Sequence, residues 1–128
     1  MSRLPKGLRG WFIAHFVIDT VFAIPLLFFP RIFLSALGFT TIDPLAARLV
    51  GAALVGIGGA SFIMRDKGRD AYESMLSLKL LWSSTAILAA AITLVERSAP
   101  LAASVGILLV FAAFFLVWAH YRQRIRQG

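Results

Sequence analysis

The sequence predicts an all-α integral membrane protein: one bundle of four transmembrane helices, with both termini in the cytoplasm. Of the 128 residues, 59% are hydrophobic and only 15% are charged, whereas soluble domains are roughly half apolar and a quarter charged. The chain also contains four apolar stretches close to the length, roughly 20 residues, that a helix needs to cross a bilayer. Lys and Arg gather at alternate ends of these stretches. The spans and their connections account for residues 1–128, so we expect a single membrane domain.

The first span is expected over residues 11–29, preceded by basic residues and stopped by Pro30. A run of this length exceeds the apolar core of a secretory signal, so the pattern favours a retained helix. The following segment, 31–41, is too short to cross a bilayer. Its apolar residues and the breaker Gly38 predict one or two helical turns in the membrane interface.

The later spans are marked by helix-start residues. Asp43 is a good N-cap and Pro44 fits the first helical position, which predicts the second span over 44–64. Asp70, with Glu73 three residues later, resembles a capping box and predicts a third span over 71–95. A fourth span follows over 99–121.

The distribution of positive charge predicts the orientation. Nine Lys and Arg residues flank the N-terminus, the middle loop and the C-terminus, and two lie in the other loops. Cytoplasmic ends carry the excess of positive charge, so both termini and the middle loop should be cytoplasmic. The nine are Arg3, Lys6, Arg9, Arg65, Lys67, Arg69, Arg122, Arg124 and Arg126; the two are Arg31 and Arg97. The aromatic residues expected at the same interface are Trp11, Tyr72, Trp118 and Tyr121.

The charge and the composition also exclude several classes of function. A net charge of +7 would suit nucleic acid, but the cations flank the spans, where topology and anionic lipid head groups account for them. We therefore expect membrane lipids and no nucleic acid. The chain has no Cys, which excludes disulfides, Cys-ligated zinc and iron–sulfur clusters. It has no catalytic motif and no carboxylate cluster with metal spacing, so we predict no catalytic residue and no metal site, and favour a non-enzyme.

Small residues should face the inside of the bundle because they let helix backbones approach closely. Polar residues should face the same way because charged and polar groups are costly in lipid. Their spacing predicts one inner face on each span. On the first span this face holds His15, Asp19, Phe22 and Ala23. On the second it holds Arg48, Ala52, Gly56 and Ala60. On the third it holds Tyr72, Lys79, Ser83, Ala86, Ala90 and Thr93. On the fourth it holds Ala102, Gly106, Val110, Ala113, Val117 and His120.

Three charged residues lie within the predicted spans. Asp19 and Lys79 are each about 12 Å from the cytoplasmic end of their helix, given a rise of 1.5 Å per residue. They are candidates for one ion pair, which is either structural or part of a ligand or proton site. Arg48 lies near the outer end of the second span. Either it pairs with Asp43 or Glu96, or its side chain extends to the membrane interface.

The remaining polar candidates have two interpretations each. His15 either carries protons, because an imidazole titrates near neutral pH, or simply bonds Asp19. Trp82 needs a partner for its indole N–H. One interpretation is that it lines a pocket with Lys79 and Ser83. The other is that it packs in the core or against lipid. A haem held by His15 and His120 is disfavoured, because no haem-binding motif accompanies the two histidines in the sequence.

The stretch 26–64 contains a pattern of Pro, Gly, Arg and apolar residues that is similar to that of a known family. Pro30, Phe33-Leu34, Leu37-Gly38, Ala47-Arg48-Leu49-Val50-Gly51-Ala52-Ala53-Leu54 and Gly56 form a pattern that resembles small bacterial four-span proteins of the DoxX-like type. The resemblance implies a multi-pass protein of the bacterial inner (plasma) membrane. DoxX proper is linked to quinone-coupled oxidation, and Arg48 is the residue that the resemblance carries over.

These observations predict a non-catalytic membrane protein that binds a lipid-like or quinone-like amphiphile, or a helix of a partner membrane protein. The alternative is a small oligomeric proton-coupled transporter that uses Asp19 and His15. A quinone is the cofactor that fits the first prediction, and a homo-oligomer or a larger membrane complex fits either. The candidate ligand-binding or proton-coupling residues are His15, Asp19, Arg48, Lys79, Trp82, Ser83 and His120.

Overall fold

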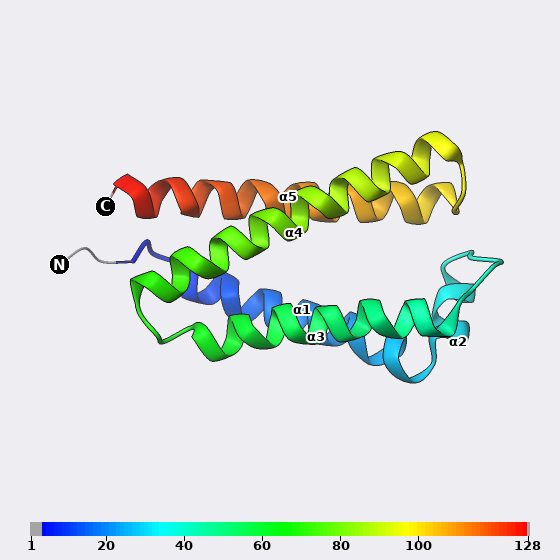
Figure 1. The fold of residues 1–128 in the computed structure, drawn as a ribbon, viewed down its shortest axis with the longest axis horizontal. Helices are drawn as coiled ribbons and strands as arrows, with labels where there is room; N and C mark the ends of the chain where they lie inside the picture. Colours follow the sequence, from blue (N-terminus) through cyan, green and yellow to red (C-terminus); the bar gives the residue numbers. More distant parts are fainter. Residues whose placement is uncertain (1–3, 128) are drawn as a thin grey trace. The chain divides into compact units, whose positions relative to one another are not determined.

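The computed structural model describes residues 4–127, which form five helices and no strand (Figure 1). The helices are α1 (Leu8–Phe28), α2 (Pro30–Ala36), α3 (Pro44–Met64), α4 (Arg69–Glu96) and α5 (Leu101–Gln127). All but α2 are long and apolar enough to cross a membrane. The all-α prediction is confirmed. Arg3, one of the nine flanking cations, lies outside the described residues.

The chain divides into two compact units. One unit spans Lys6–Gly68 and contains α1, α2 and α3. The other contains α4 and α5. In each unit the two long helices run antiparallel and side by side, as Figure 1 shows.

The first unit is held together by one face of α1 against one face of α3. Its buried residues recur every three or four positions on both helices, which is the spacing of a single helical face. They are Leu8, Phe12, His15, Asp19, Ala23 and Leu26 on α1, and Ala47, Gly51, Leu54, Gly58 and Ser61 on α3. The rings of Phe16 and Phe62 stack at 4.6 Å between centroids.

The predicted inner face of α3 is wrong by one position. Arg48, Ala52 and Gly56 are exposed, and the buried face begins instead at Ala47. The physical reason is the close approach of α1 at Gly51, where an added Cβ would lie 3.0 Å from Leu27 Cγ. On α1, His15, Asp19 and Ala23 are buried as predicted, whereas Phe22 is 48% exposed.

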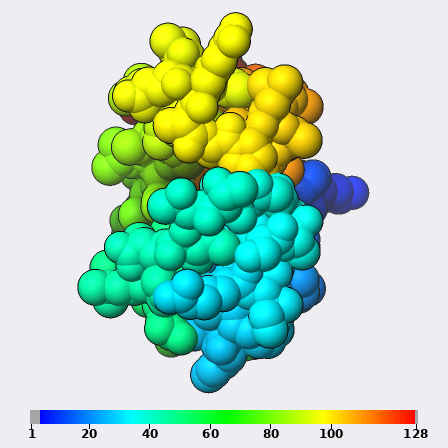
Figure 2. Space-filling view, turned by 90° about the vertical axis from the view of Figure 1, so that its right-hand side faces the viewer, coloured from blue at the N-terminus to red at the C-terminus, as the bar shows by residue number. Residues whose placement is uncertain are grey.

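The predicted short helix between the first two spans is confirmed as α2, which has seven residues. Pro30 occupies its first turn, where a backbone N–H would have no partner within the helix, so proline costs no hydrogen bond there. The predicted N-cap of α3 is confirmed as well: the Asp43 carboxylate accepts hydrogen bonds from the N–H groups of Leu45 and Ala46, at 2.9 and 3.3 Å. Figure 2 looks onto α2 and the loop that follows it, coloured cyan.

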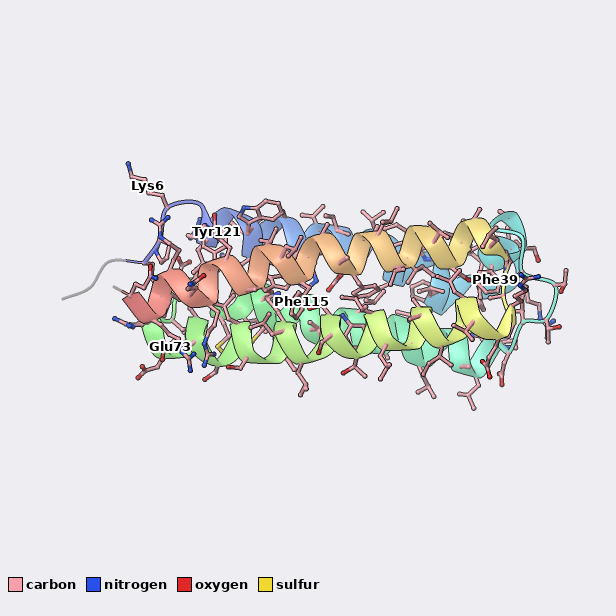
Figure 3. All side chains as sticks on the ribbon, turned by 90° about the horizontal axis from the view of Figure 1, so that it is seen from above. Lys6, Phe39, Glu73, Phe115 and Tyr121 are labelled. Carbon is pink, nitrogen blue, oxygen red and sulfur yellow. The ribbon has the colours of Figure 1, made fainter. Side chains whose placement is uncertain are left out.

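In the second unit, polar contacts tie the start of α4 to the end of α5. Arg69 Nη2 donates to the carbonyl of Ile125 at 2.6 Å, and Arg122 Nη1 donates to the carbonyl of Glu73 at 3.0 Å. In Figure 3, Glu73 and Tyr121 accordingly lie at the same end of the pair. Because of these bonds, α5 continues to Gln127 rather than ending at 121.

The start of α4 differs from the prediction. The helix begins at Arg69, directly after Gly68, whose φ is +96°. Asp70 therefore lies in the first helical turn, where its charge suits the positive end of the helix dipole, and not at the N-cap. Glu73 accepts a hydrogen bond from Arg69 at 3.4 Å.

The inner face of α4 is largely as predicted, and that of α5 is not. Tyr72, Lys79, Ser83 and Ala90 are buried on α4. On α5 the buried residues are Ser104, Trp118 and Ile125, and the exposed members of the predicted stripe are Ala102, Gly106, Val110, Ala113 and His120. The prediction failed because a large indole, not small residues, fills the space beside α4. Trp118 and Tyr72 are thus core residues rather than members of an interfacial belt.

Two helices end in the same backbone motif with different residues at its left-handed position. In the Schellman motif one residue beyond the helix has a positive φ, and two N–H groups bond back to the last turn. This residue is Gly38 after α2 (φ +96°) and Arg97 after α4 (φ +55°). Ser98 N–H bonds Thr93 O at 3.3 Å, and Phe39 N–H makes the equivalent bond at 3.0 Å.

Arg97→Gly should therefore raise the free energy of unfolding by up to about 1 kcal/mol, because glycine adopts this conformation without a Cβ clash. Equilibrium unfolding in mixed micelles measures the change. Arg97→Ala is the matched control: it removes the charge and keeps the backbone strain, so it should give no such gain. Equal stabilisation by both variants would assign the effect to the charge instead.

Candidate functional site

The first polar centre lies on α1 and consists of His15 and Asp19. Their side chains are one helical turn apart, with His15 Nε2 3.3 Å from Asp19 Oδ2. Both residues are buried, at 3% and 6% exposure. The sequence prediction that these two polar groups share an inward face of the first span is confirmed.

Gly58 on α3 forms the floor of this centre. A Cβ built at Gly58 would lie 2.8 Å from the Asp19 Cβ and 3.0 Å from Asp19 Oδ2. Real Cβ atoms essentially never show a contact as short as 2.8 Å, so glycine at this position is what lets α3 pack against the carboxylate.

Ser61, one turn beyond Gly58, is a polar residue of this interface that sequence reasoning missed. It is fully buried. Its position in the series Ala47, Gly51, Leu54, Gly58 and Ser61 was visible in the sequence. The more regular stripe of Ala52, Gly56 and Ala60 drew the prediction to the neighbouring face.

Arg48 is exposed and lies apart from this centre. Its Nε donates a hydrogen bond to the carbonyl of Leu27, in the last turn of α1, at 3.0 Å. The last carbonyls of a helix have no partner within the helix and attract cations, which explains this contact. Asp43, a predicted partner of Arg48, instead caps α3. The prediction that Arg48 points into the packed face is wrong.

The second polar centre lies in the α4–α5 pair around Lys79. Lys79 is fully buried, and its Nζ lies 4.6 Å from the centre of the Trp118 ring, in a cation–π contact. Trp118 is 1% exposed and stacks on Phe114 with ring centroids 5.6 Å apart. The hydroxyl of Ser83 is buried beside it and donates to the Lys79 carbonyl at 2.6 Å.

Trp82 lies one turn from Lys79 on α4. Its ring meets Phe111 of α5 edge to face, with centroids 5.8 Å apart. Its Nε1 is buried and has no hydrogen-bond partner among the described residues. An indole N–H only donates, so the atom that satisfies it must be an acceptor.

His120, by contrast, is exposed and has its ring against Tyr121.

An exposed ion pair joins the start of α1 to Asp66, in the loop after α3. Arg9 Nε lies 2.8 Å from Asp66 Oδ1. The hydrogen bond from Arg9 lowers the pKa of Asp66 below its ordinary value of 3.8. Desolvation opposes this shift, and the charges of Arg9 and Arg65 add to it. The carboxylate is thus favoured in the folded state.

A lowered folded-state pKa gives a stability that is present above the unfolded pKa and lost as the pH falls through the folded one. We expect the free energy of unfolding to fall on acidification below about pH 4, and to fall less in Arg9→Gln. Unfolding curves recorded at a series of pH values, for both proteins, measure the difference. Identical pH dependence in the two would exclude a contribution from this pair.

Comparisons with protein families, with curated proteins and with solved structures found no match. The resemblance of residues 26–64 to DoxX-like proteins therefore stays a prediction. Among the described residues, no group of three or more His, Asp or Glu is arranged to hold a metal ion.

Proposed function

We propose that the chain is a multi-pass membrane protein that binds, without converting it, an amphiphile whose head group accepts hydrogen bonds. The α4–α5 pair is the binding element, and Trp82 is the observation that carries the proposal. Hydrocarbon offers no water to satisfy a buried N–H, and an unsatisfied polar group costs several kcal/mol there. An indole N–H without an acceptor among the described residues favours a ligand that supplies one.

The neighbouring groups define the chemistry of that ligand. The Trp82 N–H and the Lys79 ammonium are donors only, while the Ser83 hydroxyl donates to a backbone carbonyl. A quinone carbonyl or a lipid phosphate is therefore complementary, and a donor such as an amine is not. Phe111 adds aromatic surface beside the Trp82 ring, which suits a flat quinone ring or the upper part of an acyl chain.

The membrane setting rests on four helices that are long and apolar enough to span a bilayer, and on the bias in positive charge. We assign the termini to the cytoplasm and the protein to a bacterial inner membrane. Lipids are its immediate partners, and a homo-oligomer or a larger complex is compatible with its exposed apolar side chains.

Because the chain contains no Cys, single introduced thiols test this orientation. In intact spheroplasts a membrane-impermeant maleimide should label Ser98→Cys, and should label Gln123→Cys only after the membrane is opened. Both positions are exposed. The reverse pattern would overturn the proposed topology.

Native mass spectrometry of the protein in mild detergent, followed by organic extraction, tests the binding. We expect one retained quinone or lipid per chain, and at least a severalfold lower occupancy in Trp82→Phe, which keeps the ring and removes the N–H. Trp11→Phe, at an exposed position, is the matched control and should retain the ligand. A ligand-free protein, or equal retention by both variants, would refute the proposal.

A further inference from the structure

Ser61 differs from most of the hydroxyl residues of the long helices. Serine and threonine in membrane helices commonly bond back to the carbonyl three or four residues earlier. Among residues 4–127, six do so: Thr20, Ser77, Ser83, Ser84, Thr85 and Thr93. The Ser61 hydroxyl is fully buried and has no hydrogen-bond partner among the described residues.

The register of α1 against α3 places Ser61 at the level of His15. The helices are antiparallel, with Gly58 against Asp19 and Phe62 stacked on Phe16. One turn from Gly58 toward the end of α3 therefore corresponds to one turn from Asp19 toward the start of α1. His15 is the buried polar residue at that turn, so Ser61 and His15 belong to the same layer of the interface.

We propose that Ser61, His15 and Asp19 form a site inside the α1–α3 pair that binds one water molecule and one exchangeable proton. Buried waters typically make about three hydrogen bonds to polar groups that would otherwise be unsatisfied. A hydroxyl, an imidazole and a carboxylate supply donors and acceptors for such a molecule. The Ser61 hydroxyl fixes the water, and the His15–Asp19 pair holds the proton.

Proton uptake through this site balances without a further reactant. The water accepts a proton on one lone pair and releases another to the His15–Asp19 pair, so the water itself is unchanged.

Within the unit, α3 carries no ionisable residue between Arg48 and Arg65. Arg9 and Arg31 lie at the ends of the unit, and Lys79 of α4 is the further charge that the sequence predicts at the depth of Asp19. The proposal of this site does not rest on amphiphile binding by α4–α5.

The ring of His15 reports directly on the site. The chain has two histidines, so a His120→Gln background leaves His15 as the only imidazole signal. Nitrogen-15 NMR of this protein in lipid nanodiscs, from about pH 4 to 9, should show titration of the ring across the range open to a histidine. Magnetisation transferred from water should reach the same ring nitrogens.

Ser61→Ala tests the contribution of the hydroxyl. We expect it to change the proton-binding constant of His15 about two- to tenfold, the effect of one ordinary hydrogen bond, and to weaken the water transfer. Thr20→Val is the matched control, because the Thr20 hydroxyl is satisfied by Phe16 O at 2.8 Å; it should change neither. Asp19→Asn should change the constant more than Ser61→Ala does. No titration of His15, no water transfer, or equal effects of Ser61→Ala and Thr20→Val would overturn the proposal.

Discussion

Gly58→Ala should lower the free energy of unfolding by about 1–3 kcal/mol, the usual cost of overpacking a filled interior. The added methyl group would lie 2.8 Å from the Asp19 Cβ. Both atoms are attached to helix backbone, so neither can turn away and the helices must separate. Losing that contact also disturbs the His15–Asp19 pair. Unfolding by titration with a denaturing detergent, followed by circular dichroism, measures the effect.

Gly56→Ala is the matched control on the same helix. A Cβ at Gly56 meets nothing within 4 Å, and alanine is the better helix former by roughly 0.5–1 kcal/mol. This variant should be as stable as the parent or slightly more stable. If Gly56→Ala and Gly58→Ala behave alike, the close packing of α3 on Asp19 is not a determinant of stability.

Trp118→Ala should have the largest effect of any single truncation in the α4–α5 pair, about 3–5 kcal/mol. The indole is 1% exposed and fills the space over the buried Lys79 ammonium. Its removal opens a cavity and withdraws a cation–π contact that is worth about 2 kcal/mol when desolvated. The same detergent titration measures the loss.

Two further variants separate these contributions. Trp118→Phe keeps an aromatic face over Lys79 and should lose less stability than Trp118→Ala. Trp11→Ala removes an indole that is 39% exposed, so it should cost little by comparison. Similar losses for Trp11→Ala and Trp118→Ala would contradict the core position of Trp118.

The sequence was most informative where chemistry and spacing agreed. His15 and Asp19 are polar residues four positions apart in an apolar helix, and only an inward face satisfies both conditions. The N-cap at Asp43 followed equally from local chemistry, because a carboxylate before Pro44 can accept the first free N–H groups. Such local rules need no knowledge of the neighbouring helix, which is why they held.

The errors arose where two faces of one helix carry equally plausible patterns. On α3 the small residues at 52, 56 and 60 are as regular as those at 51 and 58, and periodicity alone cannot rank them. What ranks them is the position of α1, whose Leu27 and Asp19 touch Gly51 and Gly58. On α5 the rule that small residues face inward overlooked the large indole of Trp118, which packs over the buried Lys79 ammonium.

The spacing of Gly51 and Gly58 has a mechanical consequence for the first unit. Moving α3 along α1 by one turn, about 5.4 Å, would bring the bulk of Leu54 to a position that tolerates no side chain. Arginine contacts oppose the same displacement at both ends, through Arg9 with Asp66 and Arg48 with Leu27. The α1–α3 pair should therefore resist sliding of one helix along the other.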